Sequence, residues 1–207
     1  MKQFTLITAL LLGFVACSCG SKEVKSSPET AGVDIDNNEV IADDPNENNT
    51  GLYDVDFDDP YLVSNGTFLN FKPGEPLDAY IDILREGSMQ TGEGSFKVYY
   101  IDGAEGNELG YLMTDPIDKT LIGDIFITSP AVVTEDGVRI GTTYEQLIER
   151  IGRVSFHGSE IESRVYGNSD GISYRLDMVS NQYDLDNDKI LPNTKISEIV
   201  IARKRNM

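Results

Sequence analysis

Short runs in which apolar and polar residues alternate recur from residue 61 onward, separated by glycine, proline or asparagine. Alternation with a period of two predicts strands that bury one face. The predicted strands span 96–101, 108–113, 121–128, 154–157, 163–166, 172–176 and 195–202. Asn65-Gly66 lies between two further runs, 61–63 and 67–71, and this dipeptide favours a type I′ hairpin turn.

A helical period replaces the alternation in two segments. The first spans 76–86, where Pro76 suits the first turn and Gly87 suits the end. Its apolar stripe has the spacing i, i+3, i+4 and i+7 and consists of Leu77, Tyr80, Ile81 and Leu84. The pattern therefore predicts an amphipathic helix at this place.

The second helical segment follows residues 138–141. Thr142 and Glu145 have the spacing of a capping box, and Gly152 suits the helix end. Its stripe repeats the same spacing with Tyr144, Leu147, Ile148 and Ile151. Two amphipathic helices and many short strands predict an α+β fold built on an antiparallel sheet of short strands.

The two helical stripes begin at equal distances after Gly74 and Gly141, which are 67 residues apart. This recurrence is consistent with a tandem repeat, and equally with the spacing that any α+β domain with two helices would show. Because 40% of the residues are hydrophobic, the chain can form one sizeable core. We therefore expect a single α+β domain over 60–207.

The first 16 residues have the features of a secretory signal peptide. Lys2 supplies a positive start, and the apolar run over 6–15 is shorter than the roughly 20 residues of a membrane-spanning helix. The sequence Phe-Val-Ala-Cys at 14–17 resembles the lipobox of bacterial lipoproteins. It predicts cleavage after residue 16 and acylation of Cys17, which anchors the protein to a membrane through lipid.

Two alternatives to this N-terminal prediction stay open: acylation at Cys19, or an ordinary cleaved signal followed by free or paired cysteines. Cys19 could also be a spare thiol or a second acylated residue. The residue after Cys17 is Ser18 rather than Asp. By resemblance to bacterial sorting signals, this favours the outer membrane, with the protein facing the periplasm or, alternatively, the cell surface.

Residues 17–59 are polar and acidic, and residues 20–50 contain eight acids against two lysines. Such a segment cannot bury enough apolar surface to fold, so it is predicted to be a disordered tether. Residues 54–59 are the best candidate within it for a peptide ligand. The whole chain has a formal charge of −18, and residues 61–207 carry 14 basic and 23 acidic residues. This surface would repel a phosphate backbone, so no nucleic-acid partner is expected.

The chain offers few of the groups that enzymes use. Two cysteines and one histidine are too few for a Cys/His zinc site, and no P-loop or dinucleotide motif is present. His157 closes a predicted strand, where a surface histidine is the simpler interpretation and a general base the alternative. We predict no catalytic residue, no cofactor and no enzyme activity.

Asp184, Asp186 and Asp188 alternate with other residues as carboxylates do in a calcium loop. However, Lys189 stands where an EF-hand has glycine, and Lys195 stands where it has its final glutamate. These two departures favour a solvated loop, and we predict no metal site.

Five short motifs follow one another in the second half of the chain: Gly-Val-Arg-Ile-Gly-Thr at 137–142, Tyr144, Ile-Ser-Tyr at 172–174, Leu-Pro at 191–192 and Lys-Ile-Ser-Glu-Ile-Val at 195–200. Their order and spacing resemble the RpoE-regulated (sigma-E-regulated) outer-membrane lipoproteins. The match is tight over 137–205, and before it only the element order agrees. The chain lacks the cysteine pair that relatives have near 153–167 and their tryptophan near the C-terminus. The resemblance implies an envelope lipoprotein of a family without an established molecular activity.

These observations predict a non-enzymatic binding or structural protein of the bacterial envelope that contacts another envelope protein. The alternative is a periplasmic inhibitor of lysozyme or another hydrolase. Residues 170–174, Asp-Gly-Ile-Ser-Tyr, compare with the Ser-Gly-x-x-Tyr loop of such inhibitors, and an acidic protein could be steered to a basic lysozyme. The basic residues 203–205 are interpreted as a solvated end or as a contact with anionic lipid or a partner.

Overall fold

The computed structural model describes residues 55–203. The predictions for the signal peptide, for Cys17 and Cys19 and for the tether before residue 55 lie outside these residues, as do Lys204 and Arg205. In the described part of the chain, no helix has the length and apolar character needed to cross a membrane.

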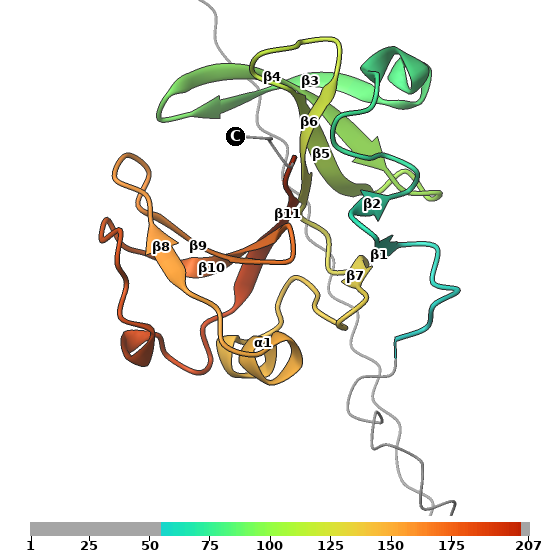
Figure 1. The fold of residues 1–207 in the computed structure, drawn as a ribbon. Coiled ribbons are helices and arrows are strands. Elements are labelled where there is room, and N and C mark those ends of the chain that lie inside the picture. Colours follow the sequence, from blue (N-terminus) through green and yellow to red (C-terminus); the bar gives the residue numbers. More distant parts are fainter. Residues whose placement is uncertain (1–54, 204–207) are drawn as a thin grey trace, which may run out of the picture. The chain divides into compact units, whose positions relative to one another are not determined.

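An antiparallel sheet with the strand order β3-β4-β5-β6-β11-β10-β9-β8 dominates the fold (Figure 1). Two four-stranded meanders thus join through their last strands, β6 and β11. The first consists of β3 (Arg85–Thr91), β4 (Gly94–Asp102), β5 (Glu108–Thr114) and β6 (Ile122–Ile127). The second consists of β8 (Phe156–Gly158), β9 (Arg164–Ser169), β10 (Ile172–Val179) and β11 (Ile196–Ile201). The seven strands predicted in this region are confirmed with shifted ends, whereas β3 was not predicted.

A smaller sheet has the order β2-β1-β7 and comprises β1 (Leu62–Ser64), β2 (Thr67–Phe68) and β7 (Val133–Thr134). β1 pairs antiparallel with β2 and parallel with β7. Asn65 and Gly66 connect β1 to β2 with φ angles of 51° and 69°. Positive φ at both central residues is what a type I′ turn requires, so the predicted hairpin is confirmed.

One α-helix occurs among residues 55–203: α1, Tyr144–Ile151. Gln146 N donates to Thr143 Oγ1 at 3.3 Å, and Thr143 N donates to Gln146 Oε1 at 3.0 Å. The capping box therefore lies one residue later than the predicted pair Thr142 and Glu145. Gly152 ends the helix, as predicted.

The predicted α+β class with two amphipathic helices is wrong, because the fold is mostly β. Residues 76–86 form two 3₁₀ turns, η1 (Leu77–Ala79) and η2 (Ile81–Ile83), and then enter β3. Pro76 provides no capping side chain, and the segment contains two aspartates, Asp78 and Asp82. These residues favour a helix less than the Glu, Gln, Leu and Arg of α1 do. Residues from Arg85 onward pair with β4, so the remaining segment is too short for further helical hydrogen bonds to compensate for this weak helix preference.

A feature does recur after 67 residues, but it is a pattern of backbone hydrogen bonds and not the pair of helices that we predicted. Gly74 and Gly141 both have a left-handed backbone, with φ of 95° and 92°. Each lies beside the start of a strand that ends its meander, β6 or β11. At the first glycine, Gly74 N donates to Ile122 O at 2.7 Å and Leu77 N donates to Thr120 O at 2.8 Å. At the second, Gly141 N donates to Ile196 O at 2.8 Å and Tyr144 N donates to Thr194 O at 2.7 Å.

The main hydrophobic core lies on one face of the large sheet, against α1 and the small sheet. Its fully buried members include Phe68 of β2, Leu147 of α1, and Leu112, Ile125, Val165, Leu176 and Ile199 of the large sheet. Because successive side chains of a strand point to opposite faces, the residues between these point away from the main core. The second face of the sheet is therefore available for other contacts.

Candidate functional site

A row of directly paired residues crosses the second face of the large sheet on four neighbouring strands: Tyr100, Tyr111, Phe126 and Val200. Tyr111 stacks on Phe126 with ring centroids 4.7 Å apart and meets Tyr100 edge-on at 6.4 Å. Tyr111 and Val200 are buried although they lie outside the main core. A second, smaller apolar cluster therefore lies on this face.

Glu198 of β11 lies at the centre of this face, and only 5% of it is exposed. Its carboxylate accepts hydrogen bonds from Tyr166 Oη at 2.9 Å and from Tyr111 Oη at 3.3 Å. The two tyrosines belong to β9 and β5, each two strands away from β11 on opposite sides. The sheet must therefore curl around Glu198, and Figure 1 shows its two halves inclined toward each other.

The curl brings together the β3–β4 turn and the β8–β9 loop, which belong to the outer hairpins of the two halves. Gly92 N donates to Glu162 Oε1 at 3.3 Å, across 70 positions of sequence. Glu162 also forms an ion pair with Arg164 at 3.0 Å. These contacts close the curled face along one side.

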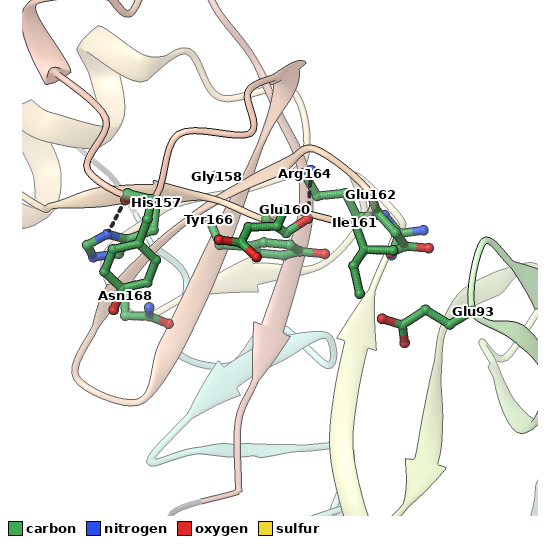
Figure 2. Close-up of a pocket in the computed structure, with 11 residues that line it drawn as sticks. Glu93, His157, Gly158, Glu160, Ile161, Glu162, Arg164, Tyr166 and Asn168 are labelled. Atoms are coloured by element: carbon green, nitrogen blue, oxygen red, sulfur yellow. Dashed lines mark hydrogen bonds and ion pairs between the residues drawn. The ribbon is translucent and has the colours of Figure 1, made fainter.

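A pocket of about 500 Å³ lies at this junction (Figure 2). Its volume falls in the range of small-ligand and side-chain pockets. The pocket is lined by the β3–β4 turn, β8, the β8–β9 loop, β9 and Tyr183. Tyr166 and Arg164 line the pocket while Tyr166 also holds Glu198, so the pocket connects directly to the buried network of the curled face.

Apolar and aromatic groups form much of the pocket surface. His157 stacks on Tyr183 with ring centroids 5.0 Å apart, and its Nδ1 lies 2.8 Å from the carbonyl oxygen of Tyr183. Ile161 is 72% exposed and Tyr183 is 69% exposed. Figure 2 shows the Ile161 side chain directed toward the part of the pocket where Glu93 lies. Large apolar side chains that remain exposed around a pocket are typical of contact surfaces.

The pocket has an excess of negative charge. Three carboxylates line it, from Glu93, Glu160 and Glu162, against the one guanidinium of Arg164. Glu162 is already paired with Arg164. The carboxylates of Glu93 and Glu160 form neither an ion pair nor a hydrogen bond with any described residue between 55 and 203. The pocket therefore offers two carboxylates without a partner among these residues, on a lining that also includes Tyr166.

The tyrosines around Glu198 have shifted pKa values. Burial, followed by the charge of Glu198 and its hydrogen bond, raises the pKa of Tyr166 to about 12. Burial and the same charge raise the pKa of Tyr111 as well. The neutral phenols are favoured because a phenolate here would lose water and lie beside a carboxylate.

These shifts predict a loss of stability at high pH. The unfolded chain releases the tyrosine proton first, near pH 10, because its pKa is not raised. The free energy of unfolding should therefore be unaffected below about pH 10 and fall between about pH 10 and 12. Urea unfolding at several pH values would measure it. Tyr166→Phe should flatten the decline, and an identical decline in both proteins would contradict this account.

Three residues that the sequence suggested as candidates have different surroundings in the structure. His157 lines the pocket and is held by a backbone carbonyl. Tyr174 is only 1% exposed in the main core, so residues 170–174 do not present it to a partner. Arg203 pairs with buried Asp115 and is not a solvated end.

In the loop with Asp184, Asp186 and Asp188, the carboxylate of Asp186 has local partners. Asp186 accepts a hydrogen bond from Asp188 N at 3.2 Å and pairs with Lys189 at 3.7 Å. Across residues 55–203, no group of three or more His, Cys, Asp or Glu side chains is arranged to hold a metal ion.

Sequence reasoning missed Glu198 and the pocket carboxylates Glu93 and Glu160. Glu198 carries a usable signal, because it is an acid directly before four apolar residues of a predicted strand, 199–202. Glu93 and Glu160 carry none, since they lie in turns of a chain with 35 acidic residues.

Comparison with known proteins adds a likeness of fold only. No protein-family model and no curated protein matches the chain. The chain is similar to the crystal structure of the uncharacterised protein YfeY from Escherichia coli, with 20% sequence identity and a TM-score of 0.45. The similarity covers 64% of this chain and 93% of that chain. It carries no argument about activity or partners.

Proposed function

We propose that this protein is a lipid-anchored lipoprotein of the bacterial outer membrane that acts as a non-enzymatic binding module. The lipobox-like residues 14–17 and the acidic tether support the anchoring. The motifs between 137 and 200 support membership of the RpoE-regulated lipoproteins. In this proposal the anchor is Cys17, and the folded domain meets its partner in the periplasm.

The pocket between the β3–β4 turn and the β8–β9 loop is the binding site in this proposal. The observation that carries it is the presence of two carboxylates without a described partner, Glu93 and Glu160, on a lining that also includes Tyr166 and the exposed Ile161. Lysine or arginine side chains fit this combination, because their apolar stems can cover Ile161 while their charges meet the carboxylates. The partner is therefore a basic segment of an envelope protein.

The pocket does not have the geometry of a nucleophile activated by a base. His157 Nδ1 is engaged by the Tyr183 carbonyl, and no hydroxyl among the described residues forms a hydrogen bond with the His157 ring. Ser159 Oγ accepts a hydrogen bond from Arg164 N at 3.1 Å. These contacts fix the loop and support binding in preference to hydrolysis.

The inhibitor alternative loses its structural basis in residues 170–174. Asp170 and Gly171 form the tight turn between β9 and β10, with φ of 50° and 88°, and Tyr174 points into the main core. A lysozyme is nevertheless a basic protein, so an assay of its activity is included in the test of the pocket.

Binding of a fluorescent hexalysine peptide to the full chain tests the pocket. Removing both carboxylates with Glu93→Gln and Glu160→Gln should weaken binding about tenfold, because two partly exposed ion pairs together contribute about 1.4 kcal/mol. Fluorescence anisotropy at physiological salt measures the dissociation constants. The matched control is Asp82→Asn with Glu105→Gln, which removes the same charge at two exposed positions outside the pocket.

The control separates site binding from general attraction to an acidic chain. It should change the affinity by less than twofold. Equal weakening in both double variants would contradict a specific pocket. Excess protein should leave lysozyme activity unchanged, and inhibition lost with Glu93→Gln and Glu160→Gln would instead show that a lysozyme is the partner.

A further inference from the structure

The outer edge of β3 is long and regular, and its two charged residues, Arg85 and Glu86, lie at one end. Its seven residues pair with β4 without any register shift, from Arg85 opposite Tyr100 to Thr91 opposite Gly94. The strand contains no proline and no lysine, which are common devices against edge pairing. The opposite edge differs, because β8 has three residues and Gly158 N donates to Gln182 O at 2.9 Å.

Backbone groups of β3 point outward at alternate residues. The two-residue turn Gly92-Glu93 makes Thr91 and Gly94 a hydrogen-bonded pair, and such pairs alternate along an antiparallel ladder. The outward donors and acceptors therefore belong to Glu86, Ser88 and Gln90. Beyond the bonds to β4, no backbone hydrogen bond within residues 55–203 reaches them. These three side chains are exposed.

We infer that β3 pairs antiparallel with β3 of a second copy of this chain, around a two-fold axis at Ser88. This is the register that pairs all seven residues, since Ser88 is the middle residue of 85–91. Arg85 would then face Thr91, and Glu86 would face Gln90, so no like charges are opposed.

The side chains next to the axis are complementary in size. Gly87 would face Met89 of the second copy in this register. The Tyr100 ring covers Gly87 so closely that an added Cβ would lie 2.4 Å from its Cε2 atom. A methionine side chain opposite would rest on this ring, a favourable contact for its sulfur. A seven-residue edge buries little area, so the dimer is weak and depends on high local concentration.

Sedimentation equilibrium of the full chain carrying Cys17→Ser and Cys19→Ser tests the pairing. Ser88→Lys places two ammonium groups face to face at the axis and should weaken association at least about tenfold. Gln90→Lys is the matched control, because its new charge would face Glu86 of the second copy and should leave association unchanged or strengthen it. Equal weakening in both variants, or a monomer at every concentration, would overturn the inference.

A short thiol crosslinker checks the register independently. Ser88→Cys should give a covalent dimer, since the two thiols would face each other. Gln90→Cys alone should not, but a mixture of Gln90→Cys and Glu86→Cys chains should. A crosslinked dimer of Gln90→Cys with none of Ser88→Cys would contradict this register. A β3 edge that stays monomeric but captures a synthetic strand peptide would show a different occupant and also overturn self-pairing.

Discussion

Replacing Gly110 with alanine is expected to lower the free energy of unfolding by about 3 kcal/mol. Gly110 lies on β5 opposite Ile127 of β6, in the middle of the large sheet. A Cβ atom at this position would lie 2.1 Å from the carbonyl oxygen of Phe126 and 3.1 Å from Cα of Ile127. Both atoms belong to the backbone, so relief requires the two strands to separate. Chemical denaturation followed by circular dichroism measures the loss.

Gly92→Ala is the control for this prediction. Its Cβ would meet nothing closer than Glu162 Oε1 at 3.9 Å, and its backbone is not left-handed. The loss should stay within about 0.5 kcal/mol. If Gly110→Ala were as stable as this control, β5 and β6 could not pack as closely as described.

Replacing Glu198 with alanine is expected to cost about 3 kcal/mol as well. The change leaves the hydroxyls of Tyr111 and Tyr166 without their acceptor inside the curled face. It also removes the negative charge that faces Arg175 across β10 and β11. Buried polar groups that lose their partners cost more than the bond itself contributed.

Glu198→Gln keeps the volume and one acceptor oxygen, so its loss should be smaller than that of Glu198→Ala. Urea unfolding of both variants at neutral pH measures which of them loses more stability. A Glu198→Ala protein as stable as the unchanged chain would mean that the two tyrosines do not depend on this carboxylate.

Local patterns in the sequence were sufficient for most strands. Alternation placed seven strands of the large sheet, and Asn65-Gly66 identified a turn that needs positive φ at both residues. α1 was predictable because strong helix formers lie between a capping box and Gly152. Each of these features depends on residues that are adjacent in the sequence, so the sequence alone is sufficient to predict it.

Two errors in the fold have different causes: one pattern fits more than one structure, and one strand has no pattern of its own. Residues 77–84 have a helical stripe, yet weak helix formers and the β3–β4 pairing produce 3₁₀ turns there. β3 lacks an apolar alternation because it is an edge strand with both faces partly exposed. Only the pairing with β4 identifies these residues as a strand, because no pattern within 85–91 predicts one.

The candidate site was not predictable because it forms through distant contacts. Tyr111 and Glu198 are 87 positions apart and meet only when the sheet curls. Gly92 and Glu162 close the same curl. No local spacing encodes such a curl, so single acids in the turns carried no sign of a shared pocket.

Photocrosslinking of the full chain, expressed in bacteria, tests the proposed binding site most directly. A benzophenone amino acid replaces Ile161 beside the pocket, which is 72% exposed, or Ile117, which is 88% exposed and lies outside the pocket. Position 161 should give one discrete adduct with a basic envelope protein, and position 117 should not. Glu93→Gln with Glu160→Gln should remove most of that adduct. Adducts that are the same from both positions, or that persist without the two carboxylates, would contradict a binding pocket for a basic segment.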